Sequence, residues 1–240
     1  MRELVVEETR DLLVRRVAND FITVVSLAVE KADRADVVLT GGSVGIDVLK
    51  AVRNSPLVDS IDWSKVHIWW GDERFVAAGH ADRNDAQAVE ALLGSLQLEP
   101  RNVHSFPAAQ GQSLTQARDD FAETLDREFD GRPHFDVVLN GIGPDGHVAS
   151  LFPGLPHGNP GEFVIAVDDS PKPPSERLSL TFSALNAGEQ VWIVAAGSDK
   201  ADAIGALMND GEADAVPAVL LEGARETRVY VDSLAGAAST

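Results

Sequence analysis

Four short apolar runs, each closed by glycine or charged residues, constrain the fold of this chain more than any other feature. They read ADVVLT before GGS, VHIWW before GDERF, FDVVLN before GIGPDGH, and VWIVAA before GSDK. Continuous apolar runs of this length are typical of strands buried on both faces of a parallel sheet. Apolar residues at helical spacing over 13–28, and expected helices over 45–53 and 199–208, alternate with these runs. With further strands expected at 3–6 and at RVYVDS, the pattern predicts an α/β fold with an open, mostly parallel sheet and helices on both faces.

The acidic composition of the chain narrows the range of partners. Twenty Lys and Arg residues against 38 Asp and Glu residues give a formal net charge of −18. Such a surface repels nucleic acid backbones and anionic lipids, so we expect neither a nucleic-acid nor a membrane partner. Cysteine is absent, which excludes disulfides, a thiolate metal site and a cysteine nucleophile. The start of the chain has no apolar signal core, and no run reaches membrane-spanning length, so we expect a cytoplasmic location.

The chain shows no fixed-period repeat and no long low-complexity linker. An apolar fraction of 44% is enough for a full core, and we expect a single domain over residues 1–240. Residues 153–177 are rich in proline and glycine, which predicts a long surface loop. The tail over 235–240 is expected to fray.

Chemically active residue types follow the apolar runs directly. Open parallel sheets bind ligands beyond the carboxyl ends of their strands, so we expect these loops to meet at one edge. Asp72, Glu73 and Arg74 come straight after VHIWW, and three adjacent charges cannot all face a core. Their position predicts that at least one of them belongs to a site, with a solvated turn as the alternative.

The stretch NGIGPDGHVASLF is the most informative motif. Asp145 and His147 lie two residues apart across a glycine, where a helix over 146–151 could begin. A carboxylate that accepts a hydrogen bond from one imidazole nitrogen leaves the other nitrogen free to take a proton from water. This pattern makes His147 a candidate general base. The alternative is that Asp145 caps a helix and His147 is a surface residue of its first turn.

Residues 41–45, GGSVG, have two interpretations. They fit G-x-S-x-G, the nucleophile elbow of serine hydrolases. They also fit a strand–glycine–helix unit whose backbone N–H groups bind an anion. An elbow needs an earlier oxyanion loop and usually a late histidine, yet no histidine follows His157. We therefore expect Gly41, Gly42 and Ser43 to bind an anion.

Three cations accompany these loops. Lys200 lies in GSDK, and Lys172 and Arg177 lie in SPKPPSER within the long loop. Lysine offers a movable charge and arginine a fork for phosphate oxygens, although each could equally be a solvated surface cation. His67, inside an apolar run, and the four tryptophans are expected to pack in the core. Because no H-E-x-x-H or similar spacing occurs, we expect no metal site.

Together these motifs resemble the 6-phosphogluconolactonase family, within the sugar-phosphate isomerase/deaminase superfamily. The resemblance covers nearly the whole chain and rests on LTGGS, WWGDERFV followed by DRND, NGIGPDGHVASLFP, SPKPPSERLSLT and GSDKADAI, in that order. It implies a modified Rossmann-like fold and hydrolysis of 6-phospho-D-glucono-1,5-lactone in the oxidative pentose phosphate pathway. It also implies no metal and no cofactor. We expect a monomer, with a weak dimer as the alternative.

The resemblance further implies roles for individual residues. His147 resembles the residue that activates water, with Asp145 beside it. Arg74 resembles the cation placed against the reacting carbonyl oxygen or the carboxylate product, and Asp72 matches an acidic site position. The implied phosphate-binding set contains residues from three loops: Gly42, Ser43, Arg177 and Lys200, with Lys172 as a further candidate.

Two departures from the family pattern bear on alternatives. Val44 and Gly45 follow GGS where the family usually has Thr-Pro, so a hydroxyl ligand to phosphate is lost. Residues 151–153 read LFP where the related amino-sugar-phosphate deaminases carry a glutamate, which disfavours an isomerase or deaminase. A non-catalytic sugar-phosphate-sensing domain is the third possibility. It would need a DNA-binding module, for which the short stretch before the first glycine loop leaves little room.

Overall fold

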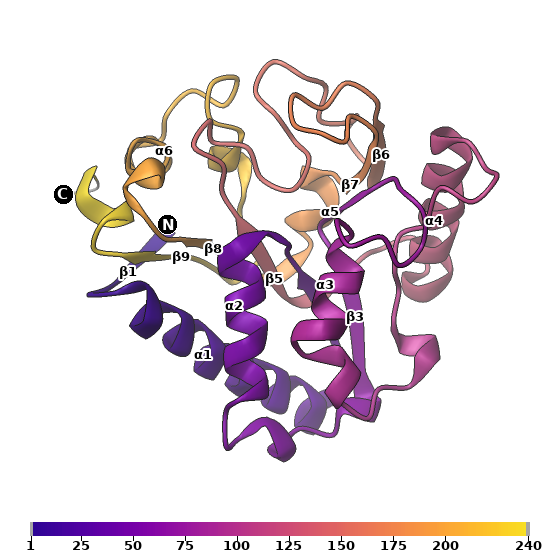
Figure 1. Ribbon diagram of the computed structural model, residues 1–240, viewed down its shortest axis with the longest axis horizontal. Coiled ribbons are helices and arrows are strands. Elements are labelled where there is room, and N and C mark those ends of the chain that lie inside the picture. The colour runs from indigo at the N-terminus through magenta and orange to yellow at the C-terminus, as the bar shows by residue number, and fades with distance from the viewer. Residues whose placement is uncertain (1, 239–240) are drawn as a thin grey trace.

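The computed structural model of the protein describes residues 2–238 and contains two sheets (Figure 1). The main sheet has six parallel strands in the order β1-β9-β8-β5-β2-β3. Its strands are β1 (Arg2–Glu7), β2 (Ala35–Leu39), β3 (Val66–Trp70), β5 (Phe135–Gly141), β8 (Gly188–Ala195) and β9 (Glu226–Asp232). The small antiparallel sheet consists of β4 (Asp72–Arg74), β7 (Arg177–Leu180) and β6 (Val164–Val167), in that order. The predicted α/β fold with a mostly parallel sheet is confirmed.

Helices cover both faces of the main sheet, as predicted. They are α1 (Arg10–Ala32), α2 (Gly42–Arg53), α3 (Asn84–Ala91), α4 (Leu114–Phe129), α5 (Phe182–Leu185) and α6 (Ala201–Met208). Short 3-10 turns are η1 (Val58–Ser60), η2 (Trp63–Lys65), η3 (Leu93–Ser95), η4 (Pro100–Asn102), η5 (Ser198–Lys200), η6 (Pro217–Leu220) and η7 (Ala235–Ala238). Helices α1 and α2 pack on one face, and α6 lies on the opposite side (Figure 1). Of the helices between residues 2 and 238, none combines the length and apolar character that crossing a bilayer requires.

Local sequence signals explain where the long helix α1 begins and which face it buries. The Thr9 side chain accepts a hydrogen bond from the backbone N–H of Leu12, which caps the helix start. Its buried residues recur at three- and four-residue spacing and pack on the sheet: Leu13, Val14, Val17, Ala18, Phe21, Ile22 and Val25. The helical period read from the sequence is therefore the period of the buried face.

The core lies between the two helical layers and includes the tryptophans. Every residue of β2 is buried, as expected for a central parallel strand. The side chains of Trp63, Trp69, Trp70 and Trp192 are all buried, so the prediction that they pack is confirmed. His67 lies in β3 as predicted, but it is only half-buried.

Two local predictions are wrong. Residues 146–151 form turns with an isolated bridge between Val148 and Leu151 rather than a helix. The backbone φ angles of +76° at Gly146 and 49° at Ala149 lie in the left-handed region, which stops a helix from forming there.

The second error is the tail, which does not fray at residue 235. Residues 235–238 form η7, where Ala235 and Gly236 are buried and the N–H of Ala235 donates to Asp232 at 2.8 Å. The remainder of the predicted tail, residues 239–240, lies outside the described residues.

Candidate active site

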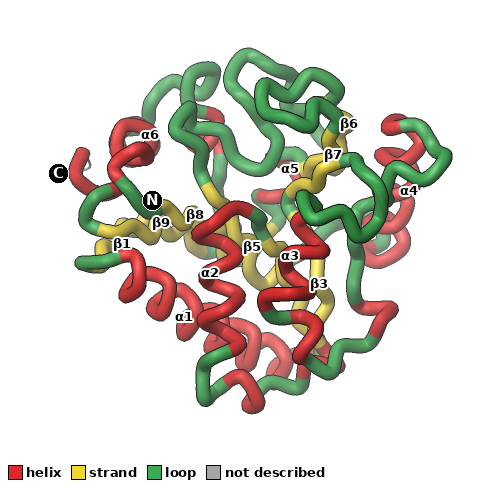
Figure 2. The backbone as a smooth tube through the Cα atoms, viewed as in Figure 1, coloured by secondary structure: helices red, strands yellow, loops and turns green. Residues whose placement is uncertain are grey.

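The carboxyl ends of the parallel strands all open on one edge of the main sheet. The loops that follow β2, β3, β5 and β8 carry the glycine and charge clusters named from the sequence. The small sheet adds a fifth segment, because β4 pairs with β7 and places Arg74 opposite Arg177. Figure 2 shows that the long loops gather on the same side of the molecule, beside β6 and β7. The expectation that separate loops meet at one edge is therefore met.

His147 is held in place by the glycines that precede it. The N–H of Gly143 donates to the carbonyl of His147, and the N–H of Gly146 donates to the carbonyl of Gly143, both at 2.9 Å. A Cβ atom on Gly143 would lie 1.9 Å from Nδ1 of His147, so only glycine lets the imidazole approach this closely. The ring also stacks on Phe152, with centroids 4.6 Å apart.

Asp145 and His147 form a directed pair. Oδ1 of Asp145 lies 2.5 Å from Nδ1 of His147. Burial lowers the pKa of His147 and outweighs Asp145, which acts in the opposite direction, while the nearby Lys172 adds to the lowering. Burial would raise the pKa of Asp145, but its hydrogen bond and charge interaction with His147 leave that pKa lowered. At neutral pH, Asp145 is thus a carboxylate that accepts from Nδ1, and Nε2 of His147 carries the lone pair, with Nζ of Lys172 3.5 Å away.

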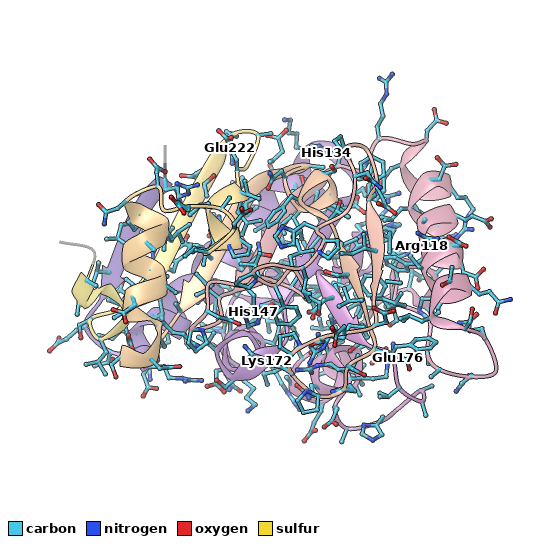
Figure 3. The ribbon with its side chains drawn as sticks, turned by 90° about the horizontal axis from the view of Figure 1, so that it is seen from above. Arg118, His134, His147, Lys172, Glu176 and Glu222 are labelled. Atoms are coloured by element: carbon cyan, nitrogen blue, oxygen red, sulfur yellow. The ribbon has the colours of Figure 1, made fainter. Side chains whose placement is uncertain are left out.

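Lys172 reaches the same pair from the long loop. Its Nζ lies 3.2 Å from Nδ1 of His147 and 3.7 Å from Oδ1 of Asp145, and Figure 3 shows the two labelled side chains together. Burial lowers the pKa of Lys172, and the charges of Lys200 and Arg177 lower it further against the opposing effect of Asp145. The resemblance made Lys172 only a further candidate for the phosphate, and in this structure Lys172 contacts the candidate base.

Asp72 is buried beneath this edge. Its Oδ2 accepts a hydrogen bond from the hydroxyl of Ser150 at 2.6 Å and lies 3.8 Å from Nη1 of Arg177. Its other oxygen lies 3.3 Å from the amide nitrogen of Asn84. Asp72 therefore connects the small sheet, the DGH turn and the start of α3.

Arg74 is oriented by groups that follow it in the chain. Its Nη1 donates to the carbonyl of Asp82 at 2.6 Å and to Oδ1 of Asn84 at 2.8 Å. Among the described residues, its Nε and Nη2 groups have no hydrogen-bond partner, which leaves donors for a ligand. The guanidinium is held at one end and open at the other, as a stabiliser of a carbonyl oxygen requires.

Asn84 is a site residue that the sequence reasoning missed. Besides accepting from Arg74, its amide donates to the carbonyl of Asp72 at 2.8 Å. A Cβ atom on Gly41 would lie 2.0 Å from its Oδ1, so Asn84 also touches the first glycine loop. The only signal was its place in DRND, one of the segments that carry the family resemblance.

Glu73 supports this arrangement from below. The backbone N–H groups of Arg74 and Asn84 both donate to its Oε1 at 2.8 Å, and that of Asp85 donates to its Oε2 at 2.9 Å. Burial raises the pKa of Glu73 to about 7. Of the three adjacent charges, Glu73 caps the start of α3, while Asp72 and Arg74 face the candidate site.

The first glycine loop has the form of an anion site. Helix α2 begins at Gly42, whose φ angle is +78°, and its N-cap Gly41 makes no side-chain capping bond. Because the cap residue has no side chain to accept hydrogen bonds from the first-turn N–H groups, these groups can bind an anion. A groove of about 730 Å³ runs from Gly42, Ser43 and Arg74 along α2 and α3.

The same loop does not build a serine nucleophile. The hydrogen bonds of the described residues pair His147 with Asp145 and Lys172, not with Ser43.

Gly45 has a packing reason for standing where the family usually has proline. A Cβ atom there would lie 2.8 Å from the carbonyl oxygen of Thr40, so glycine allows α2 to lie close to the end of β2.

Arg177 and Lys200 are less free than the sequence suggested. The Nε of Arg177 donates to the carbonyl of Pro174 at 3.1 Å, and its Nη2 donates to the carbonyls of Lys172 at 3.0 Å and Pro173 at 3.2 Å. The ammonium of Lys200 lies 3.2 Å from Asp199. Arg177 thus holds the loop that carries Lys172, and Lys200 adds positive charge near it.

One group of metal-type ligands occurs among residues 2–238, and it contains none of the predicted site residues. It consists of His67, His104 and Glu128. Motif spacing could not reveal it because its members come from three separate segments.

Comparison with known proteins identifies relatives of this chain. A family model described as glucosamine-6-phosphate isomerases/6-phosphogluconolactonase matches residues 8–230. A 6-phosphogluconolactonase of Streptomyces coelicolor is 42% identical and aligns over 97% of this chain and 93% of its own. The crystal structure of a 6-phosphogluconolactonase from Thermotoga maritima superposes with a TM-score of 0.85 at 26% identity, over 97% of this chain and 100% of that chain.

The fold itself is shared more widely. A monomeric glucosamine-6-phosphate deaminase superposes with a TM-score of 0.83 at 15% identity, over 98% of this chain and 99% of its own, which shows a common fold alone. Family membership instead rests on the matching family model and on the sequence identity to the Streptomyces protein. The chain belongs to the glucosamine-6-phosphate isomerase/6-phosphogluconolactonase family.

Proposed function

We propose that the protein hydrolyses 6-phospho-D-glucono-1,5-lactone to 6-phospho-D-gluconate in the oxidative pentose phosphate pathway, with His147 activating water. The observation that carries this proposal is the pairing of His147 with Asp145, 2.5 Å apart at the edge where the loops converge. The Streptomyces and Thermotoga relatives, both named 6-phosphogluconolactonases, support the same activity. A single domain, a cytoplasmic location and a monomer or weak dimer are part of the proposal.

The chemistry needs one base and one oxyanion stabiliser. Nε2 of His147 takes a proton from water while the water oxygen bonds to the lactone carbonyl carbon, and Asp145 stabilises the imidazolium that forms. Donors of Arg74 stabilise the negative carbonyl oxygen, and each such donor contributes about 2.7–4 kcal/mol. The carbonyl then re-forms as the ring C–O bond breaks, and the imidazolium returns its proton to the departing ring oxygen. Since a lactone is an activated ester, this route needs no covalent intermediate.

Binding of the phosphate group would orient the rest of the substrate in the site. The uncapped start of α2 and the cations Lys172, Lys200 and Arg177 supply local positive potential on a chain whose net charge is −18. Anchoring the phosphate at one end of the substrate fixes the distant carbonyl near His147.

The segment after His147 supports a lactonase over a deaminase. Leu151 and Phe152 are both buried, and Phe152 stacks on the imidazole. The position expected to hold a second carboxylate for ring opening is therefore filled by apolar packing.

The test is proton release from freshly generated 6-phosphogluconolactone, with and without the protein, against spontaneous hydrolysis. Unphosphorylated gluconolactone is the control. We expect acceleration with the phosphorylated lactone and little with the control. No acceleration of either substrate would refute the assignment, and equal acceleration of both would refute the phosphate anchor alone.

A further inference from the structure

Three side chains that can bind a metal ion meet outside the proposed active site. His67 lies in β3, His104 follows η4, and Glu128 lies in the last turn of α4. One ligand atom from each lies within 4.8 Å of the ligand atoms of the other two. Imidazole and carboxylate are ligand types that Zn²⁺ binds, commonly as two histidines and one glutamate with an open fourth position.

The spacing of the two imidazoles suits a shared ion. Nδ1 of His67 and Nε2 of His104 lie 3.0 Å apart. Two nitrogens bound to one tetrahedral Zn²⁺ at about 2.0–2.1 Å lie roughly 3.3 Å from each other. A slight separation and tilt of the rings, with a rotamer change of Glu128, would therefore convert the hydrogen-bonded pair into two ligands.

The histidines are held in the protonation state that metals require. Burial, assisted by the neighbouring His67, lowers the pKa of His104 to about 4, and burial also lowers the pKa of His67. Both rings are thus neutral at pH 7, and a neutral imidazole is the ligating form.

Nearby charges act in both directions. Glu128 and Asp36 favour a cation, whereas Arg34 opposes it, with its Nη2 3.7 Å from a Glu128 oxygen. Arg127 lies 3.9 Å from Glu128 and also opposes a cation. Arg101 opposes a cation at His67 as well, so two carboxylates stand against three guanidinium groups around the cluster.

The surrounding residues fix His104 firmly. Its backbone N–H donates to the carbonyl of Ile68 at 2.8 Å, and its ring stacks on Trp69 with centroids 3.8 Å apart. Trp69 is fixed in turn by a hydrogen bond of 2.9 Å from its indole N–H to Asp36. Supporting contacts of this kind orient the ligands of metal sites. His67 and Glu128 are partly exposed, which gives an ion a path from solvent.

We propose that His67, His104 and Glu128 bind a first-row transition-metal dication, with Zn²⁺ as the probe. The ion would join β3, the segment after η4 and the end of α4, and it would take no part in lactone hydrolysis. The site is thus a stabilising clamp, separate from the proposed active site.

The test is calorimetric titration of the metal-free, full-length protein with Zn²⁺, together with thermal unfolding. We expect one Zn²⁺ per chain, and a rise in Tm of roughly 5–10 °C at one hundred times the Kd. His67→Asn and Glu128→Gln should each weaken binding at least tenfold and abolish most of the Tm rise. His67→Asn should leave lactone hydrolysis unchanged.

Two control variants separate this site from other histidines. His134→Gln removes an exposed imidazole on the loop before β5, and Figure 3 shows that residue at the margin of the molecule, away from His147. His147→Gln tests whether Zn²⁺ binds the Asp145–His147 pair instead. Unchanged binding in both controls supports the proposal. Loss of binding only in His147→Gln, or no binding by the unaltered protein at millimolar Zn²⁺, would overturn it.

Discussion

Two histidines of this protein, His147 and His104, are both buried enough to be neutral, yet they are suited to different chemistry. His147 has a carboxylate 2.5 Å from Nδ1, on a turn at the carboxyl edge of the sheet. His104 has another imidazole at 3.0 Å and the face of Trp69 at 3.8 Å. A general base must accept a positive charge during the reaction, and Asp145 stabilises that charge. Between residues 2 and 238, the ring of His104 is hydrogen-bonded to an imidazole and to no carboxylate, so the partner of the imidazole decides which chemistry is possible.

The largest expected effect comes from removing the imidazole at the edge. His147→Gln should lower kcat by about 10³-fold, because general base catalysis contributes roughly 10²–10⁴-fold. The matched change His67→Asn, in the other histidine cluster, should alter kcat by less than about twofold, within the small effects typical of sites without a named mechanism. Both are measured by proton release. Substantial turnover in His147→Gln would erase the distinction between the two clusters.

Removing the carboxylate charge of Asp145, the partner of His147, should have the second-largest effect on kcat. Asp145→Asn keeps the size of the side chain but cannot stabilise an imidazolium, and its amide can present a donor to Nδ1. We expect kcat to fall by roughly 10- to 100-fold with little change in KM, since the interaction strengthens only in the transition state. Steady-state kinetics at pH 7.5 would show this. A rise in KM with kcat preserved would mean that Asp145 serves binding instead.

The cluster of His67 and His104 should affect the free energy of unfolding rather than the rate of hydrolysis. The pKa of His104 is about 4 in the folded protein and about 6.5 when unfolded, so the unfolded chain binds more protons between these pH values. Stability contributed by neutral His104 is complete above pH 6.5 and is lost as pH falls towards 4, by about 2–3 kcal/mol. His104→Gln should lose correspondingly less stability between pH 7 and 4.5 in urea unfolding.

The quantity to compare is the loss of unfolding free energy on acidification, in His104→Gln against the unaltered protein. Glu73 has a pKa raised to about 7, so its stabilisation is present at low pH and is lost as pH rises through 7. This opposes the trend from His104 but is common to both proteins and cancels. If both proteins lost the same unfolding free energy between pH 7 and 4.5, His104 would not be the group responsible.

The smallest effect should come from Lys172. Its charge lowers the pKa of His147, so Lys172→Met should raise that pKa. Because catalysis requires neutral His147, the acid limb of the kcat/KM profile should move to higher pH. Loss of a phosphate contact would lower kcat/KM without moving the limb. An unmoved limb would therefore assign Lys172 to the phosphate alone.

The sequence predicted the frame of this site because its signals are local. Apolar runs ending in glycine identified the parallel strands, and parallel strands place their carboxyl ends together. The Asp145–His147 pair was accessible for the same reason, since two residues across a glycine are close in any fold. The small sheet was missed, because β6 has only four residues and lies in a segment dominated by proline and glycine.

The other misses depend on contacts between distant segments. His67 and His104 meet only because the segment after η4 runs alongside β3, where Val103 forms a parallel bridge with Ile68. Lys172 reaches His147 because Arg177 holds the carbonyls of the loop that carries it. No spacing in the sequence encodes either approach.

The close approach of Gly41 and Asn84 has a consequence for how this family can vary. A side chain at position 41 would collide with Asn84, whose amide also holds Arg74 and Asp72. Positions 41 and 84 are therefore expected to covary among relatives, and Gly41→Ala should be rescued only by a smaller residue at 84, which releases Arg74. The loop proposed to anchor the phosphate and the arginine proposed to stabilise the carbonyl oxygen are thus coupled through the side chain of Asn84.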